Sequence, residues 1–483
     1  MKKLVKLNKK KGKSQITMLA LSTALTGIVG FSSVSSASAA VPTITEKLTI
    51  ENDLTVKQAR TSNETIIEWK NWVNDRAYSL TSIQPEKVEQ QKIPSSNFED
   101  LEMLKPLLHD KRIVFLGESS HGAAEFNLAK TRLIQFLHQE MGYNVLAFES
   151  GLGNAMNAQG QIGKQTAEQT MKNAIFGVWW TKETLPLFDY VKKTQNTEQP
   201  LVLAGFDIQQ QGPFTNGDWL QNSQLAKQLK DTENELVDWS FGKDLKGYQK
   251  AKPSIVKVYT QVKSQVKLKE KELKAAYPNE PHIVKLMERI LSERIRLANE
   301  YVELDIQSNI ELEQNNPTTF YKTMEWRDQA MLANLLWLAE EIYPTEKFIV
   351  WAHNDHIRKA QSEVMGTPYP VKFMGELLPE IYKKYSYVLG IYMAGGETAS
   401  NNTREPMNVL PPVKGSIEDI LSTTKKPYTF IDMRYRQNER GNSWMFEPRL
   451  SYSWGFIQES LVPRDQYDGL LLIDKVSKPN YLK

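Results

Sequence analysis

The chain has 483 residues, of which 40% are hydrophobic and 24% are charged, a balance typical of a globular protein. It contains no cysteine, which excludes a disulfide scaffold, a thiolate metal site, a cysteine nucleophile and a lipid anchor on an N-terminal cysteine. The 60 basic and 57 acidic residues nearly balance, so the formal net charge is only +3.

The first 39 residues have the order of a secretory signal peptide. Seven lysines and no acidic residue lie within 1–13, an apolar stretch covers 16–31, and a run of small residues leads to Ala37-Ser-Ala39. The apolar stretch is shorter than the roughly 20 residues that span a bilayer, which favours cleavage over a retained membrane anchor. Without these lysines the net charge of +3 becomes −4, so nothing in it favours nucleic-acid binding. We expect a secreted or cell-wall-associated protein with no stable membrane insertion.

After a partly helical lead-in over 40–98, short apolar runs alternate with stretches of helical spacing. The expected strands cover 112–116, 143–148, 200–206, 347–352, 385–392, 428–432 and 469–474. Short apolar runs separated by helices are typical of βα units, so the pattern predicts an α/β fold. Its mostly parallel sheet should be flanked by helices, with the core divided into a first half, 99–221, and a second half, 323–483.

Residues 222–322, between these halves, show no strand pattern. Apolar residues recur every three or four positions from Ile255 to Leu273 and from Ile283 to Leu304, and the segment 277–281 joins the two runs. This predicts a large all-helical insertion built around a helical hairpin. Two roles stay open for it, a solvated pair of helices or a cap over the functional site.

Titratable residues follow four of the expected strands. They are Glu118 and His121 after the first, Glu149 after the second, Asp207 after the third, and His353, Asp355 and His356 after the fourth. In an open parallel sheet the carboxyl ends of the strands share one edge, and ligands bind there. Three of the six histidines lie in these loops, so we expect the site at this edge.

His121 is expected to act as a general base. At the start of a helix the positive end of the dipole disfavours imidazolium, and a neutral imidazole can accept a proton from water. Glu118 could hold the ring in one tautomer, while a metal-ligand role and a structural role remain alternatives. A nucleophilic serine is disfavoured because the Gly-x-Ser-x-Gly pattern that begins at Gly117 ends in His121, so Ser119 or Ser120 is expected to cap the helix.

The pair His353 and His356 has two main interpretations. With Glu118, Glu149 and His121 they could ligate a divalent metal, or they could donate hydrogen bonds to a developing oxyanion in a metal-free site. A structural role is a third possibility. The His-Glu-x-x-His motif is absent, so we expect no metal and no other cofactor, with a divalent metal as the alternative.

Three segments, 117–126, 132–137 and 142–149, resemble the erythromycin esterase family. Further matches are Trp179-Trp180 with Glu183, Gly205–Asp207, Arg327-Asp328 with Met331 and Asn334, and His353–His356. The resemblance holds in order and spacing from about residue 100 to the C-terminus. It implies hydrolysis of a macrolactone ester by water, with His121 as general base and no covalent enzyme intermediate. Glu118 and Glu149 would orient His121 and the water, and His353 and His356 would line the same cleft.

One position departs from the family pattern. The family places an arginine nine residues after the histidine, and here that residue is Lys130. The resemblance implies a substrate-binding role for Lys130. Lysine keeps the charge but lacks the planar fork that anchors a carboxylate in bidentate fashion.

A small-molecule ester is therefore the expected partner. A role in macrolide antibiotic resistance is implied by the resemblance, although that role is useful inside the cell and this chain carries an export signal. Family members also carry names tied to polysaccharide biosynthesis. A metal-dependent hydrolase of a cell-envelope ester and a secreted relative that binds without turnover are the alternatives.

Overall fold

The computed structural model describes residues 61–87 and 93–483. The expected signal peptide, 1–39, lies outside the described residues, as does much of the lead-in. The helices are α3 (Asn63–Arg76), α4 (Leu104–Leu108), α5 (Ala124–Met141), α6 (Leu152–Gly160), α7 (Ala167–Ala174), α8 (Leu185–Thr194), α9 (Ser223–Ser240), α10 (Leu245–Gln265), α11 (Glu270–Ala276), α12 (Ile283–Arg296), α13 (Val302–Glu313), α14 (Thr318–Trp337), α15 (Asn354–Ile357), α16 (Met374–Leu377), α17 (Glu380–Lys384), α18 (Ile417–Leu421) and α19 (Pro463–Gln466).

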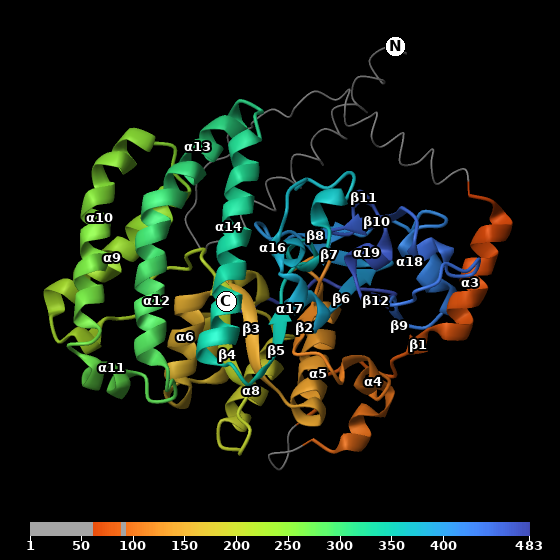
Figure 1. Ribbon diagram of the computed structural model, residues 1–483, viewed down its shortest axis with the longest axis horizontal. Coiled ribbons are helices and arrows are strands. Elements are labelled where there is room, and N and C mark those ends of the chain that lie inside the picture. The colour runs from red at the N-terminus through yellow and green to blue at the C-terminus, as the bar shows by residue number, and fades with distance from the viewer. Residues whose placement is uncertain (1–60, 88–92) are drawn as a thin grey trace.

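A single eight-stranded sheet runs through the described part of the chain, in the order β1-β9-β12-β6-β2-β5-β3-β4 (Figure 1). Its strands are β1 (Tyr78–Ser79), β2 (Ile113–Leu116), β3 (Tyr143–Gly151), β4 (Val202–Asp207), β5 (Lys347–Trp351), β6 (Ser386–Met393), β9 (Tyr428–Asp432) and β12 (Gly469–Ile473). From β12 to β4 every neighbouring pair is parallel, whereas β9 pairs antiparallel with both β12 and β1. The predicted α/β fold with a mostly parallel sheet is confirmed, and all seven expected strands belong to this sheet.

Helices cover both faces of the sheet, because its central strands are apolar on both sides. Along β3, Val145 and Ala147 face the cluster that includes the apolar residues of α9–α14, whereas Leu146 and Phe148 face the cluster of α5, α7 and α8. Such strands appear in the sequence as unbroken apolar runs, which is why they were predictable.

Two antiparallel ribbons were not expected. They are β7 (Glu397–Ala399) with β8 (Pro406–Asn408), and β10 (Arg449–Ser453) with β11 (Ile457–Leu461). Strands of three residues are too short to show a period, and β10 and β11 mix charged and hydroxyl side chains into their alternation.

The helical section forms a layer beside the β3–β4 edge of the sheet (Figure 1, green). α10 packs against α12, as a helical hairpin requires, but α9, α13 and α14 pack with them, so the layer is larger than the predicted pair. α14 begins inside the predicted insertion, packs against β4 and continues into the second half of the core. It therefore connects the helical layer to the site. No helix in 61–87 or 93–483 is long and apolar enough to cross a bilayer.

Candidate active site

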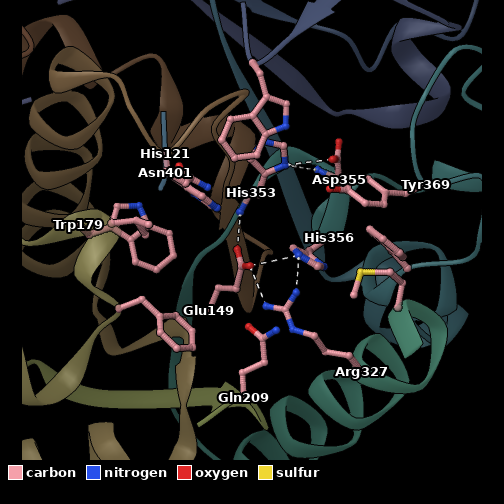
Figure 2. A pocket seen from close by; sticks show the side chains of 15 residues that line it. His121, Glu149, Trp179, Gln209, Arg327, His353, Asp355, His356, Tyr369 and Asn401 are labelled. Atoms are coloured by element: carbon pink, nitrogen blue, oxygen red, sulfur yellow. Dashed lines mark hydrogen bonds and ion pairs between the residues drawn. The ribbon is translucent and has the colours of Figure 1, made fainter. Parts of the chain in front are cut away.

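The carboxyl ends of four adjacent strands, β2, β5, β3 and β4, surround one pocket (Figure 2). The pocket encloses a cavity of about 60 Å³ and is partly open to solvent. His121, Glu149, His353 and His356 line it, so four of the predicted residues meet there. Glu118 and Lys130 do not line the pocket and lie fully buried behind it.

His121 is held through one ring nitrogen. Its Nδ1 lies 2.5 Å from Glu118 Oε1, which also accepts a hydrogen bond of 2.9 Å from Trp179 Nε1. Burial raises the pKa of Glu118, but Lys130 and His121 together hold it below its ordinary value, so the group is a carboxylate. A carboxylate accepts only, so Nδ1 of His121 carries the proton and Nε2 keeps its lone pair.

Lys130 contacts Glu118, and its position corrects the substrate-binding role expected from the resemblance. Its side chain is fully buried, its Nζ donates to Glu118 Oε2, and the same nitrogen lies 3.7 Å from the centre of the Trp351 ring. Burial lowers the pKa of Lys130 to about 8, although Glu118 acts in the opposite direction. Lys130 therefore compensates the buried charge of Glu118 and does not touch the pocket.

The loop that carries His121 differs from the predicted helix start. α5 begins at Ala124, so His121 lies before the helix and the dipole argument does not apply. The expected capping by Ser119 or Ser120 is wrong as well, because Ser120 Oγ bonds to Gly122 N and Thr398 Oγ1. A Cβ added at Gly122 would lie 2.2 Å from the Ala399 carbonyl oxygen, which explains the glycine.

His353 presents an unpartnered nitrogen. It caps α15, where its Nδ1 accepts a hydrogen bond of 3.2 Å from the backbone N–H of Asp355. The same Nδ1 also lies 3.3 Å from Asp355 Oδ2, whereas Nε2 is buried and has no partner within the described residues. The ring centres of His353 and His121 lie 5.2 Å apart, so Nε2 of His353 is available to a ligand next to His121.

His356 bonds to carboxylates on both sides. Its Nδ1 lies 2.8 Å from Asp328 Oδ1 and its Nε2 lies 3.1 Å from Glu149 Oε1. Burial lowers its pKa, but these two carboxylates outweigh burial and raise it to about 10. His356 is therefore an imidazolium at neutral pH.

This buried imidazolium predicts a loss of stability at alkaline pH. The pKa of His356 rises from 6.5 to about 10 on folding. Its contribution to the free energy of unfolding is therefore complete below pH 6.5 and is lost as pH rises through about 10. Lys130 makes the opposite contribution. Because folding lowers its pKa from 10.5 to about 8, Lys130 raises the free energy of unfolding as pH increases from about 8 to 10.5. We therefore expect the difference in unfolding free energy between the unmodified protein and His356→Asn to shrink from pH 7 to pH 10 in urea titrations. A difference in unfolding free energy that stays constant from pH 7 to pH 10 would contradict the assignment of His356 as an imidazolium.

Arg327 links two of the strand ends and was not predicted as a site residue. From α14 its Nη2 donates to Asp207 Oδ2 at 2.6 Å and to Glu149 Oε1 at 3.1 Å, beside His356 (Figure 2). Glu149 Oε2 accepts from the His353 backbone N–H at 2.8 Å. Burial raises the pKa of Glu149, but His356 and Arg327 lower it well below its usual value, so both of its oxygens are occupied acceptors. In the sequence, the signal for Arg327 was the match of Arg327-Asp328 to the pattern of the erythromycin esterase family.

Trp454 forms an aromatic wall that sequence reasoning missed. Its ring stacks on His353 with centres 4.8 Å apart and meets His121 edge-on at 5.3 Å. Trp454 has a φ of 58°, uncommon for a bulky side chain, and its backbone N–H donates to the Ser119 carbonyl at 2.6 Å. Trp454 lies in the turn between β10 and β11, a ribbon that was itself unexpected.

The arrangement of the histidine and carboxylate side chains does not favour a divalent metal ion in the pocket. Within the described residues, no three His, Asp or Glu side chains are arranged to hold a metal ion. Both ring nitrogens of His356 bond to carboxylates, and His121 uses Nδ1 for Glu118. The remaining three histidines are elsewhere: His138 bonds to Tyr190 and the Gln199 carbonyl, His282 packs edge-on against Tyr343, and His109 is exposed.

Comparison with known proteins identifies the family. The sequence model of the family described as Erythromycin esterase matches residues 138–476. The chain belongs to the erythromycin esterase family. A relative in Bacillus subtilis (strain 168), YbfO, is 33% identical over 86% of this chain and 92% of its own, and it is named as a hydrolase without a stated substrate.

Two more distant members of the group carry the family name. The erythromycin esterase type II of Escherichia coli is 23% identical over 71% of this chain and 85% of its own. The solved structure of an erythromycin esterase mutant in its open conformation superposes with a TM-score of 0.55, at 18% identity, over 84% of this chain and 99% of that one. The superposition shows a shared fold, and family membership together with the hydrolase relative supports a hydrolase function.

Proposed function

We propose that this erythromycin esterase-family protein hydrolyses a carboxylic ester in a small molecule of the macrolactone type, with water activated by His121. The observation that carries the proposal is the pairing of His121 with Glu118, which leaves Nε2 as an acceptor on the pocket at the carboxyl ends of the strands.

In this mechanism His121 Nε2 takes a proton from water as the water oxygen attacks the ester carbonyl. The imidazolium that forms is stabilised by the Glu118 carboxylate at 2.5 Å. The negative charge that develops on the carbonyl oxygen receives a hydrogen bond from His353 Nε2–H, which has no other partner within the described residues. His121 then returns the proton to the alkoxide as the C–O bond breaks, which yields a carboxylic acid and an alcohol.

The other charged groups position these two imidazoles. Glu149 accepts from the His353 backbone N–H and is itself held by His356 and Arg327. Because both of its oxygens are occupied and its pKa is held low, Glu149 is a poor proton acceptor. We assign it a positioning role for His353, distinct from the contact with water that the family resemblance implies.

Mass spectrometry tests the proposal directly. The purified chain is incubated with a panel of macrolactones, including erythromycin, in ordinary water and in water labelled with heavy oxygen. We expect a product that gains one water and, in labelled water, the heavier isotope. Failure of every macrolactone to change would contradict the macrolactone proposal, and the panel would then extend to cell-envelope esters. His109→Ala, an exposed histidine, serves as the matched control.

Glu118→Gln should lower kcat by about 10²–10⁴-fold. The amide of glutamine can donate to Nδ1 and so favour the tautomer with the proton on Nε2, which removes the base. Steady-state kinetics beside Glu168→Gln, an exposed residue paired with Lys172, measures the effect. An unchanged kcat in Glu118→Gln would show that Glu118 does not set the tautomer.

We also propose that the protein acts outside the cytoplasm, because residues 1–39 have the pattern of a signal peptide. The N-terminal sequence of protein recovered from the culture medium and the cell wall tests this, with a start just after Ala39 expected. Recovery of the full-length chain from the cytosol alone would contradict export.

A further inference from the structure

A second pocket, with a cavity of about 80 Å³, adjoins the first one. Gln209 and Met324 line both pockets, so the two cavities share a wall. Figure 2 shows Gln209 next to Arg327 and below Glu149. A molecule whose ester lies at His121 could therefore extend past Gln209 into the second pocket.

Asp305 of α13 provides an unpaired carboxylate in this second pocket. Its side chain is half-buried and makes no hydrogen bond or ion pair with any residue in 61–87 or 93–483. Burial raises its pKa to about 7, and Arg327 only partly opposes this. A carboxylate in an otherwise largely apolar pocket costs stability unless a partner compensates it, and Arg327 compensates Asp305 only in part.

Gln210 is an independent sign of a ligand. Its side chain is 5% exposed and lines the pocket, yet its Nε2 is buried without a hydrogen-bond partner among the described residues. Its Oε1 is used by Ser240 Oγ at 3.4 Å. A buried amide N–H₂ without an acceptor is rare in folded proteins, so this donor is available for a ligand.

Two aromatic residues also line the second pocket, one of them in a stretch of irregular helix. Tyr301 lines the pocket one helical turn before Asp305, at the end of the π-helical segment Leu297–Tyr301, and Phe241 lines it from the end of α9. π-helical turns inside α-helices occur frequently at functional sites. Aromatic faces beside a carboxylate are the environment that binds organic cations.

We propose that this second pocket is a subsite for the part of the substrate remote from the ester, and that Asp305 binds a protonated amine on that part. Gln210 Nε2 would donate to a hydroxyl or ether oxygen next to the amine. Arg327 is the cation that faces Asp305 from α14, but Glu149 and Asp207 already neutralise it. The subsite role rests on the proposed ester hydrolysis, whereas the binding of a cation does not.

Binding to the full purified chain tests the cation site without any turnover. Isothermal titration uses benzyltrimethylammonium and, as the neutral probe, benzyl alcohol. We expect the ammonium to bind about tenfold more tightly than the alcohol, a preference that Asp305→Asn abolishes. Asp238→Asn, an exposed carboxylate on α9 next to the pocket residue Val237, should retain the preference. Equal binding of both probes, or a preference that survives Asp305→Asn, would overturn the proposal.

Turnover separates failure of the subsite from failure of the proposed function. Benzoylcholine and 3,3-dimethylbutyl benzoate differ only in a charged nitrogen in place of carbon. We expect kcat/KM to favour benzoylcholine by about tenfold, and Asp305→Asn to remove this preference, whereas Asp238→Asn should retain it. Hydrolysis of both esters without preference would overturn the subsite. Ammonium binding without hydrolysis of any ester would leave the cation site standing and refute the esterase proposal.

Discussion

Replacement of His121 by alanine is expected to reduce kcat for ester hydrolysis by about 10²–10⁴-fold, the usual contribution of a general base. The fold should be unaffected, because Glu118 keeps Lys130 and Trp179 as partners when the imidazole is lost. Among the residues that the structure describes, the imidazole bonds to Glu118 alone, and His121 is 9% exposed at the pocket. Steady-state kinetics and thermal unfolding of the same preparation measure the two effects.

Two further measurements on this variant exclude a structural explanation. Added imidazole should restore part of the activity to His121→Ala, because the cavity that it leaves opens to the pocket. His109→Ala should behave as the unmodified protein, because His109 is exposed and its Nδ1 bonds to the Pro106 carbonyl, away from the pocket. Activity of His121→Ala within tenfold of the unmodified protein would refute the role of His121 as base.

Replacement of Arg327 by methionine is expected to lower the free energy of unfolding by about 3–5 kcal/mol. Arg327 pairs with Glu149 and Asp207, which are 4% and 1% exposed, so its loss leaves Asp207 without a cation and Glu149 with His356 alone. Among the described residues, Asp207 would keep the backbone N–H groups of Ile208 and Gln209 as its partners. Urea unfolding at pH 7 measures the loss.

The matched control for this variant is Arg296→Met. Arg296 is about one-third exposed and pairs with Glu300 at 3.2 Å, so its loss should cost less than about 1 kcal/mol. The deficit of Arg327→Met should also shrink on acidification, because the carboxylates left unpaired can then take up protons. A deficit of Arg327→Met no larger than that of the control would show that the buried network does not stabilise the fold.

Much of the fold could be predicted because the information is local. A strand buried on both faces, such as β2 or β6, is an unbroken apolar run in the sequence. The location of the site followed from a rule about sheets, since the residues after β2, β3, β4 and β5 share one edge. The partnership of Glu118 with His121 spans three positions of one loop and was therefore visible as well.

Other parts of the site depend on contacts between distant segments. The pairs of Arg327 with Asp207 and Glu149 join positions 120 and 178 residues apart, and Trp454 reaches His353 from a ribbon with no clear period. Burial is likewise a tertiary property. Lys130 matches a family arginine in the sequence, and only its full burial behind Glu118 separates a charge-compensating role from a substrate-binding one.

The sequence by itself determined the α/β fold, the order of its strands along the chain and the two loops that carry the imidazoles, because apolar periodicity and short-range spacing encode them. The tertiary structure decided which charges meet, that Glu149 is an occupied acceptor and His356 an imidazolium, and that a second pocket adjoins the first. The physical reason is that charge state and pocket shape depend on desolvation and on partners from remote segments, which become neighbours only when the chain is folded.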